Sequence, residues 1–277
     1  MRFEVEEPKI HYSLFTIDYK SVWVKPNGLF FRINNMPLKA ANVLLIAVLV
    51  CLVFISCGKG NGYSPYNPAP PYDPPPANTK RYLALGDSYT VGQSLPKEES
   101  FPAQLITTLR VQGYPFSDAE IIATTGWTTG NLLDAIASKT VDKPYDLVSL
   151  LIGVNNQYQR RSLEEYRAQF TTLLNKAITF AGNNPAHVIV LSIPDYSVTP
   201  YASSADRNEI ARQIDSFNAV NVEISVDRKV NYVDITPESR KALNDDTLVA
   251  ADGLHFSAKE YRIWVDMLLP SVRQILK

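Results

Sequence analysis

Residues 80–90 read KRYLALGDSYT, and this stretch carries the first evidence on both the fold and the chemistry. The apolar run Arg81–Leu85 predicts a buried β-strand, and Gly86 permits a tight turn after it. Ser88 then stands at the carboxyl end of the strand, where a helix begins. On its own, such a serine is more often a turn residue or a helix N-cap than a nucleophile. The G-x-S-x-G motif of α/β-hydrolases is not met, because Thr90 occupies its last position.

Short apolar runs alternate with longer amphipathic ones through residues 80–277. Strands are predicted at Arg81–Leu85, Ala119–Thr124, Tyr145–Ile152, His187–Ile193 and Val230–Ile235. Helices are predicted at Phe101–Gln112, Thr129–Ser138, Leu163–Ala181, Ala205–Asp227 and Ser257–Leu276, the last kinked or ended by Pro270. Nearly all-apolar strands alternating with helices indicate the α/β class, a five-stranded parallel sheet between two helical layers. In such a three-layer α/β/α domain, ligands bind beyond the carboxyl ends of the strands.

A second motif, Asp252-Gly253-Leu254-His255, precedes the last predicted helix. A carboxylate three residues before a histidine can reach the imidazole Nδ1 across a turn, leaving Nε2 free to act as a base. An ordinary helix-entry loop explains the same residues equally well when they are considered alone. The other histidine of the domain, His187, opens a predicted buried strand, and we expect it to be structural.

Two further polar loops follow predicted strands. Asn155, in the sequence Gly-Val-Asn-Asn, follows the third strand and carries an amide that can donate to an oxyanion. Gly126, in the loop after the second strand, offers a backbone N–H for the same purpose. The four polar segments therefore fall at strand ends on one edge of one sheet. This coincidence favours a catalytic site over four unrelated loops.

Taken in chain order, these motifs resemble the SGNH/GDSL hydrolase family over residues 80–277. The four blocks of the family are matched by Gly86-Asp87-Ser88, Gly126, Gly153-x-Asn155 and Asp252-x-x-His255. The resemblance implies a flavodoxin-like α/β/α fold, and some flanking residues look like those of bacterial acylhydrolase-like lipoproteins. The third block of the family usually ends in Asp, and Asn156 stands here in its place.

The resemblance also implies a serine esterase that works through an acyl-enzyme. Ser88 would be the nucleophile, His255 the general base and acid, and Asp252 the residue that orients the imidazole. The oxyanion would be bound by the backbone N–H groups of Ser88 and Gly126 and by the Asn155 amide. Neither a metal nor an organic cofactor is expected.

Four side chains adjoin these positions and are candidates for substrate contact: Asp87, Tyr89, Trp127 and Asn156. The rings of Tyr89 and Trp127 suit stacking on a sugar, and equally suit packing against their own loops. For an exported esterase of this family, we expect the substrate to be a short acyl group, such as acetyl, on a glycan. A lysophospholipase or thioesterase would need a long apolar acyl channel. A lipoprotein that binds glycan without turning it over would be expected to lack the serine or the histidine.

The first eighty residues differ in character from the rest. Residues 36–56 have a positive start followed by an apolar run that is short for a spanning helix, which is the layout of a secretory signal. The ending Phe54-Ile55-Ser56-Cys57 resembles a bacterial lipobox and predicts lipidation at Cys57. An uncleaved membrane anchor is the alternative. We expect an exported lipoprotein on the periplasmic or outer face, with the outer membrane as the favoured site.

Residues 1–35 fit no part of such a signal, so Met36 is the expected start and the preceding stretch a mis-assigned extension. Their aromatic and β-branched residues suit a hairpin equally well. Residues 57–79 are rich in Pro and Gly and predict an extended linker.

Charge and cysteine content exclude several functions. The net charge of -1 gives no reason to expect nucleic acid as a partner. The two cysteines, Cys51 and Cys57, both lie in the signal region, so the domain has no disulfide framework.

Overall fold

The computed structural model describes residues 22–24, 31–33 and 78–277. The chain forms two units, Met1–Tyr72 and Asp73–Lys277. In the first unit, β1 (Val22–Val24) pairs antiparallel with β2 (Phe31–Ile33). The predicted signal at residues 36–56, Cys57 and nearly all of the predicted linker lie outside the described residues. Among the described residues, no helix is long and apolar enough to cross a membrane.

The second unit is built on a five-stranded sheet in which every pair of neighbouring strands is parallel. In spatial order the strands are β4 (Glu120–Ala123), β3 (Tyr82–Gly86), β5 (Leu147–Leu151), β6 (Val188–Leu191) and β7 (Asn231–Val233). Every residue of β3, β5 and β6 is buried, which explains why these strands are continuous apolar runs in the sequence.

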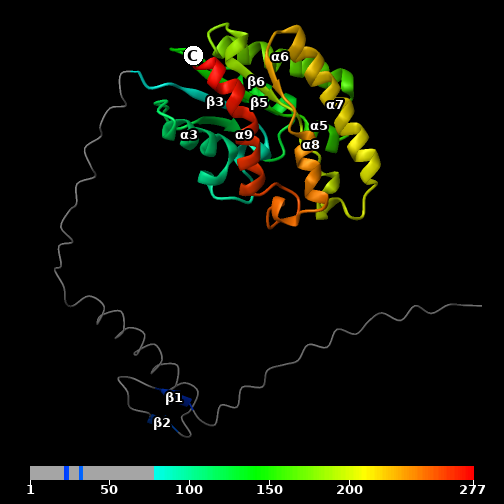
Figure 1. The fold of residues 1–277 in the computed structure, drawn as a ribbon. Helices are drawn as coiled ribbons and strands as arrows, with labels where there is room; N and C mark the ends of the chain where they lie inside the picture. The colour runs from blue at the N-terminus through cyan, green and yellow to red at the C-terminus, as the bar shows by residue number, and fades with distance from the viewer. Residues whose placement is uncertain (1–21, 25–30, 34–77) are drawn as a thin grey trace, which may run out of the picture. The chain divides into compact units, whose positions relative to one another are not determined.

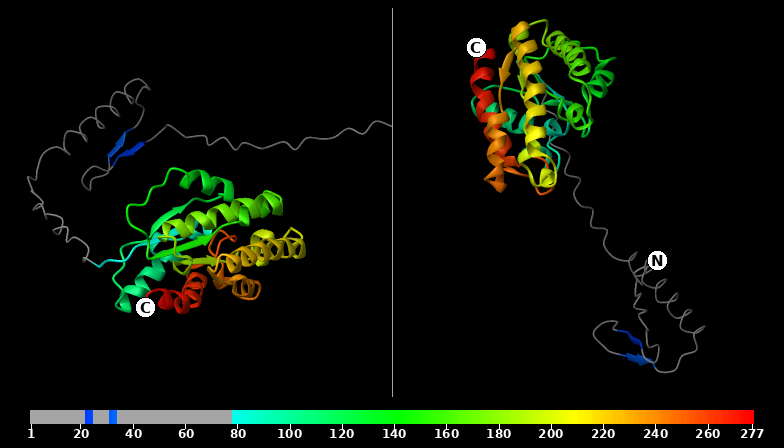
Figure 2. Two further views of the ribbon diagram at one scale, coloured as in Figure 1. Left: turned by 90° about the horizontal axis from the view of Figure 1, so that it is seen from above. Right: turned by 90° about the vertical axis from the view of Figure 1, so that its right-hand side faces the viewer.

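Helices cover both faces of this sheet (Figures 1 and 2). On one face, α3 (Phe101–Val111) packs against α9 (Ala258–Ile275). On the other, α6 (Leu163–Phe180) lies between α4 (Thr129–Ile136) and α7 (Arg207–Asp227). The predicted three-layer α/β/α fold with a five-stranded parallel sheet is therefore confirmed. Helix α9 continues through Pro270 to Ile275, so this proline does not end it.

The strand order reverses between β3 and β5, because the chain leaves β3 toward β4 and then crosses back to β5. Connections on either side of such a reversal diverge, and the crevice between them is the usual ligand site of open parallel sheets. Two short helices begin at this place, α2 (Ser88–Val91) after β3 and α5 (Val154–Tyr158) after β5. Their first residues come from the Gly-Asp-Ser and Gly-Val-Asn motifs.

Candidate active site

Ser88 is the first residue of α2 and is held by a turn that only glycine can begin. A Cβ on Gly86 would lie 2.1 Å from Thr90 Oγ1 and 2.4 Å from the Leu151 carbonyl oxygen, so any larger residue would push β3 away from β5. Asp87 is the N-cap of the helix, and its Oδ1 accepts a hydrogen bond from the Tyr89 N–H at 3.1 Å. The serine side chain is thereby presented at the carboxyl edge of the sheet.

Asp87 itself does not line the pocket that contains Ser88. Only 1% of its surface is exposed, and burial raises its pKa to about 7 in spite of hydrogen bonds from backbone N–H groups. A carboxyl of this kind is ionised only in part at neutral pH. Asp87 therefore shapes the turn before the serine, and the predicted substrate contact is not seen.

His255 and Asp252 are paired in the loop before α9. The imidazole Nδ1 lies 2.6 Å from Asp252 Oδ2, while Asp252 Oδ1 accepts the backbone N–H groups of Leu254 at 3.0 Å and His255 at 2.9 Å. The Tyr89 ring meets the His255 ring edge-on, with centroids 5.7 Å apart. These contacts fix the orientation of the imidazole and direct Nε2 away from the carboxylate.

The Asp252 carboxylate is held in its charged form. Partial burial acts to raise its pKa, but the hydrogen bonds from the Ser94 hydroxyl, the His255 ring and two backbone N–H groups outweigh that effect. The net result is a pKa well below the usual range of an aspartate. A permanent negative charge beside Nδ1 is the feature that stabilises an imidazolium when His255 takes up a proton.

Asn155 reaches the same site from the other side of the strand reversal. Gly153 begins α5 with φ of 135°, and a Cβ there would lie 2.6 Å from both Ile193 Cδ1 and Tyr166 Oη, so glycine is required. The Asn155 Nδ2 donates one hydrogen bond to the Trp127 carbonyl oxygen at 3.0 Å. Because an amide nitrogen carries two hydrogens, the second is available to the pocket that Asn155 lines.

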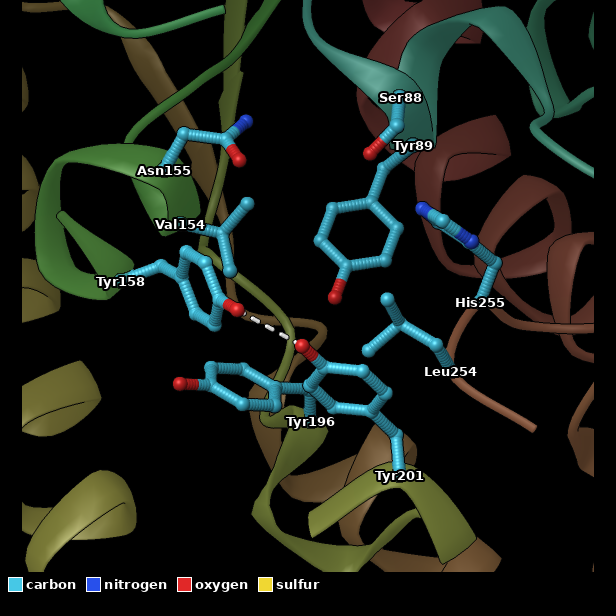
Figure 3. A pocket seen from close by; sticks show the side chains of 9 residues that line it. All are labelled: Ser88, Tyr89, Val154, Asn155, Tyr158, Tyr196, Tyr201, Leu254 and His255. Carbon is cyan, nitrogen blue, oxygen red and sulfur yellow. Dashed lines mark hydrogen bonds between the residues drawn. The ribbon is translucent and has the colours of Figure 1, made fainter. Parts of the chain in front are cut away.

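A pocket of about 140 Å³ joins these groups. Ser88 and His255 lie on one side of it and Asn155 on the other, and an aromatic and aliphatic wall closes the end (Figure 3). That wall consists of Tyr89, Val154, Tyr158, Tyr196, Tyr201 and Leu254. Ser88 forms no hydrogen bond with His255 among the described residues, as is common for catalytic pairs without substrate. A serine hydroxyl, an imidazole paired with a carboxylate and a side-chain amide thus meet at one small cavity, an arrangement that suits acyl transfer.

Residues 84–263 match the GDSL-like Lipase/Acylhydrolase family. The chain belongs to this family. It is therefore an ester-hydrolysing serine hydrolase, as the order of its sequence motifs predicted. No curated protein matches the hydrolase in sequence.

Solved structures of the same fold cover about seven-tenths of the chain. The lipase/acylhydrolase from Enterococcus faecalis has a TM-score of 0.57 and 19% identity, covering 71% of this chain and 95% of its own. For the acetylxylan esterase Axe2 from Geobacillus stearothermophilus, the TM-score is 0.56 and the identity 17%, with coverages of 70% and 94%. The esterase EstA from Pseudoalteromonas sp. is inhibited by monoethylphosphonate in its solved structure. Its TM-score is 0.54 and its identity 19%, and the match covers 72% of this chain and 98% of EstA. At such identities the likeness establishes the fold.

Of the four candidates for substrate contact, Tyr89 lines the pocket, whereas Asp87, Trp127 and Asn156 do not. Asn156 is fully buried and uses its amide on Thr129. Trp127 packs partly buried against the core. The Tyr89 side chain is only 2% exposed, because Phe256, Trp264 and His255 surround its ring, so this ring offers no open face for a sugar.

Gly126 adopts φ of 85° in an exposed loop, with open space where a Cβ would lie. It is not among the residues that line the pocket in this structure. Its neighbour Thr125 is tied to the loop after α2, since the Thr125 hydroxyl donates to Gln93 Oε1 at 2.5 Å. The part of the chain that the structure describes contains no group of three or more His, Cys, Asp or Glu side chains able to hold a metal.

Sequence reasoning identified Tyr89 but missed the other three tyrosines of the hydrolase pocket. Tyr158 lies three residues after Asn155, a spacing that places both on one face of a helical turn and could have identified it. Tyr196 follows the Ile-Pro-Asp sequence after β6, another strand end on the same edge. Tyr201 carries no comparable signal, because its place depends on how the segment after β6 folds back over the site.

Proposed function

We propose that the hydrolase removes short acyl groups, such as acetyl, from a glycan, with Ser88, His255 and Asp252 as its catalytic triad. The observation that carries the proposal is the pocket of about 140 Å³, in which Ser88 and His255 face Asn155 and a wall of tyrosines. Membership of the family shows that the reaction is ester hydrolysis. The volume and lining of the pocket support the proposed substrate, a short acyl ester of a glycan.

In the first half of the reaction, Ser88 Oγ attacks the ester carbonyl carbon while His255 Nε2 takes the serine proton. Asp252 stays ionised and stabilises the imidazolium through the Nδ1 contact of 2.6 Å. The carbonyl oxygen becomes an oxyanion, for which the backbone N–H of Ser88 and the free Nδ2 hydrogen of Asn155 are the donors at the pocket. The N–H of Gly126, the third donor of the family pattern, would have to move toward the pocket to take part.

In the second half, the tetrahedral intermediate collapses as His255 gives its proton to the departing alcohol oxygen. The carbon–oxygen bond of the ester breaks and an acyl-enzyme on Ser88 remains. Water then gives a proton to His255 Nε2 and attacks the acyl carbon. The bond between this carbon and Ser88 Oγ breaks as His255 returns the proton to Oγ, which releases the acid and restores the serine. The cycle needs no redox step and leaves the protein unchanged.

The pocket volume favours a small acyl group. An apolar protein cavity of about 150 Å³ accommodates a ligand the size of benzene. The pocket is of that order, and its lining includes the buried Tyr196 and the half-buried Leu254. A thioesterase or lysophospholipase would need a channel past this wall.

The glycan part of the proposal rests on the outer edge of the pocket. Tyr158 is 56% exposed and Tyr201 is 49% exposed, although both are large aromatic residues. Their hydroxyl groups are 2.7 Å apart, which holds the two rings together. Paired exposed tyrosines offer an apolar surface with polar ends, which suits the faces and hydroxyls of a sugar ring. Two proteins with solved structures of the same fold, Axe2 and AlAXEase, are described as acetyl xylan esterases.

The test compares ester substrates on the full-length protein and its Ser88→Ala variant. We expect acetate esters to be hydrolysed faster than octanoate esters, acetylated xylooligosaccharides to be deacetylated, and Ser88→Ala to lose at least about 10³-fold in kcat. Ser138→Ala, an exposed serine just after α4, is the matched control and should retain full activity. A preference for octanoate would favour the lysophospholipase or thioesterase alternative. Equal activity of parent and Ser88→Ala would reject the triad.

We also propose that the hydrolase is tethered to a membrane through a lipidated Cys57, on the strength of the lipobox-like sequence that ends there. Metabolic labelling with an alkyne fatty acid should mark the parent and the Cys51→Ser control but not Cys57→Ser. Several acyl chains on one cysteine would give firm anchoring. Labelling that persists in Cys57→Ser would reject this site.

A further inference from the structure

Ser94, in the loop after α2, makes a direct contact with the triad acid. Its hydroxyl donates to Asp252 Oδ2 at 2.5 Å, although the two residues are 158 positions apart in the chain. The same Oδ2 faces the Nδ1 of His255 at 2.6 Å. The oxygen that supports the imidazole is therefore also the oxygen that Ser94 holds.

The loop that carries Ser94 is fixed to the nucleophile by its backbone. The N–H groups of Gly92 and Gln93 both donate to the carbonyl oxygen of Ser88, each at 3.0 Å. Ser94 itself has φ of 70°, a left-handed conformation that costs a non-glycine residue free energy. A glycine would adopt this backbone without strain, so the turn alone does not explain a serine at this position. The contact of its hydroxyl with Asp252 does.

We propose that Ser94 is a positioning residue that sets the Asp252 carboxylate, and through it the His255 ring, relative to Ser88. The inference rests on the proposed triad. The Asp252 side chain is 30% exposed, and its Oδ1 is already held by two backbone N–H groups. The Ser94 hydroxyl occupies a remaining lone pair of Oδ2 and replaces a water there, so it limits rotation of the carboxylate. It also withdraws part of the negative charge that faces the imidazole.

Removing the hydroxyl leaves the carboxylate less well oriented toward the imidazole, so kcat should fall by about 10-fold or more, as expected for a lost hydrogen bond to a charged group. KM should change little, because Ser94 is not among the residues that line the pocket.

The experiment uses two variants that differ in strain but lack the same hydroxyl. Ser94→Gly relieves the left-handed strain and should raise Tm or leave it unchanged, whereas Ser94→Ala keeps the strain. If Ser94 acts through Asp252, both variants show the same fall in kcat with KM little changed. Ser94→Asn, which tolerates this backbone and keeps a hydrogen-bond donor, should recover part of kcat. Activity that follows Tm, with Ser94→Gly as active as the parent, would overturn the proposal.

Each Ser94 variant is also combined with Asp252→Ala. In that background Ser94→Gly should cause no further loss, because its partner is gone, and multiplying losses would overturn the proposal. Asp252→Ala measured alone separates the two levels of inference. Full activity of Asp252→Ala would reject the triad itself. A large loss in Asp252→Ala with unchanged Ser94 variants would reject only the role of Ser94.

Discussion

Asn156 and Thr129 are joined by two hydrogen bonds, one through each end of the Asn156 side-chain amide. Asn156 Oδ1 accepts the Thr129 backbone N–H at 2.9 Å, and Asn156 Nδ2 donates to Thr129 Oγ1 at 2.7 Å. Thr129 is the first residue of α4, and its hydroxyl donates onward to Gln169 Oε1 on α6 at 2.5 Å. The residue that departs from the usual family motif therefore connects α5 to α4 and, through Thr129, to α6, away from the pocket.

Asn156→Asp, which restores the usual family residue, should lower stability and leave the substrate preference unchanged. An aspartate can accept the Thr129 N–H but cannot donate to Thr129 Oγ1, whose own hydrogen is already used on Gln169. We expect the free energy of unfolding to fall by about 1–2 kcal/mol at pH 7, with kcat/KM ratios among ester substrates unchanged. Urea denaturation and an ester panel measure both.

The control for this change is Asn244→Asp, which adds the same charge at an exposed position. It should leave stability within about 0.5 kcal/mol of the parent. An altered acyl preference in Asn156→Asp at unchanged stability would mean that the side chain reaches the substrate after all.

Asn155→Ala removes a proposed oxyanion donor and should lower kcat by about 10²–10³-fold with a small change in KM. The reason is that the amide interacts with charge that develops only in the transition state. Steady-state kinetics on an acetate ester provide the measurement. Gln159→Ala, an exposed amide at the end of the same short helix, is the control. An unchanged kcat in Asn155→Ala would remove this residue from the site.

The strands and the edge that carries the site could be predicted because they depend on local pattern. Each of β3, β5 and β6 is buried on both faces, so each is an uninterrupted apolar run that the sequence reveals directly. Parallel strands bring their carboxyl ends to one edge, so the sequence pattern alone predicts that Ser88 and Asn155 lie close together.

The parts that could not be predicted depend on contacts between distant segments. Tyr201 reaches the pocket because the segment after β6 folds over it, with the Tyr201 N–H bonded to the Gly253 carbonyl oxygen at 2.9 Å. The same holds for Ser94 and Asp252, which lie far apart in sequence. The burial of Asn156 also could not be predicted locally. Its position next to Asn155 suggested contact with substrate, but the side chain is fully buried.

Tyr201→Ala should weaken hydrolysis of acetylated xylooligosaccharides more than that of small acetate esters. The tyrosine is half exposed at the outer edge of the pocket and is held by its hydroxyl to Tyr158, so deleting the ring removes part of the proposed sugar-binding surface. We expect the ratio of kcat/KM for the xylooligosaccharide over the small ester to fall by about 5-fold, since an aromatic contact contributes about 1 kcal/mol. Tyr201→Phe keeps the ring, loses only the hydroxyl, and should keep most of the parent ratio. Identical ratios in all three proteins would place the sugar elsewhere.

Glu260→Gln should make the protein more stable at pH 8 while having little effect at pH 4.5. Glu260 is fully buried in the first turn of α9, where it accepts a hydrogen bond from Trp264 Nε1 at 2.7 Å. Burial raises its pKa to about 7 in spite of that bond. Because the folded state holds the proton more tightly than the unfolded chain, this group contributes stability at low pH that is lost as the pH rises through about 7.

Glutamine cannot ionise, so the Glu260→Gln variant does not lose this stability as the pH rises. The difference in the free energy of unfolding between Glu260→Gln and the parent should therefore grow between about pH 4.5 and 7. It should level off above that range at no more than about 3 kcal/mol, since each unit of pKa shift corresponds to about 1.4 kcal/mol. Thermal and urea unfolding at several pH values would measure this difference in the free energy of unfolding. Glu164→Gln, an exposed residue in the first turn of α6, should give a flat difference over the same range. A flat difference for Glu260→Gln as well would mean that the buried carboxyl is ionised in the folded protein at every pH tested.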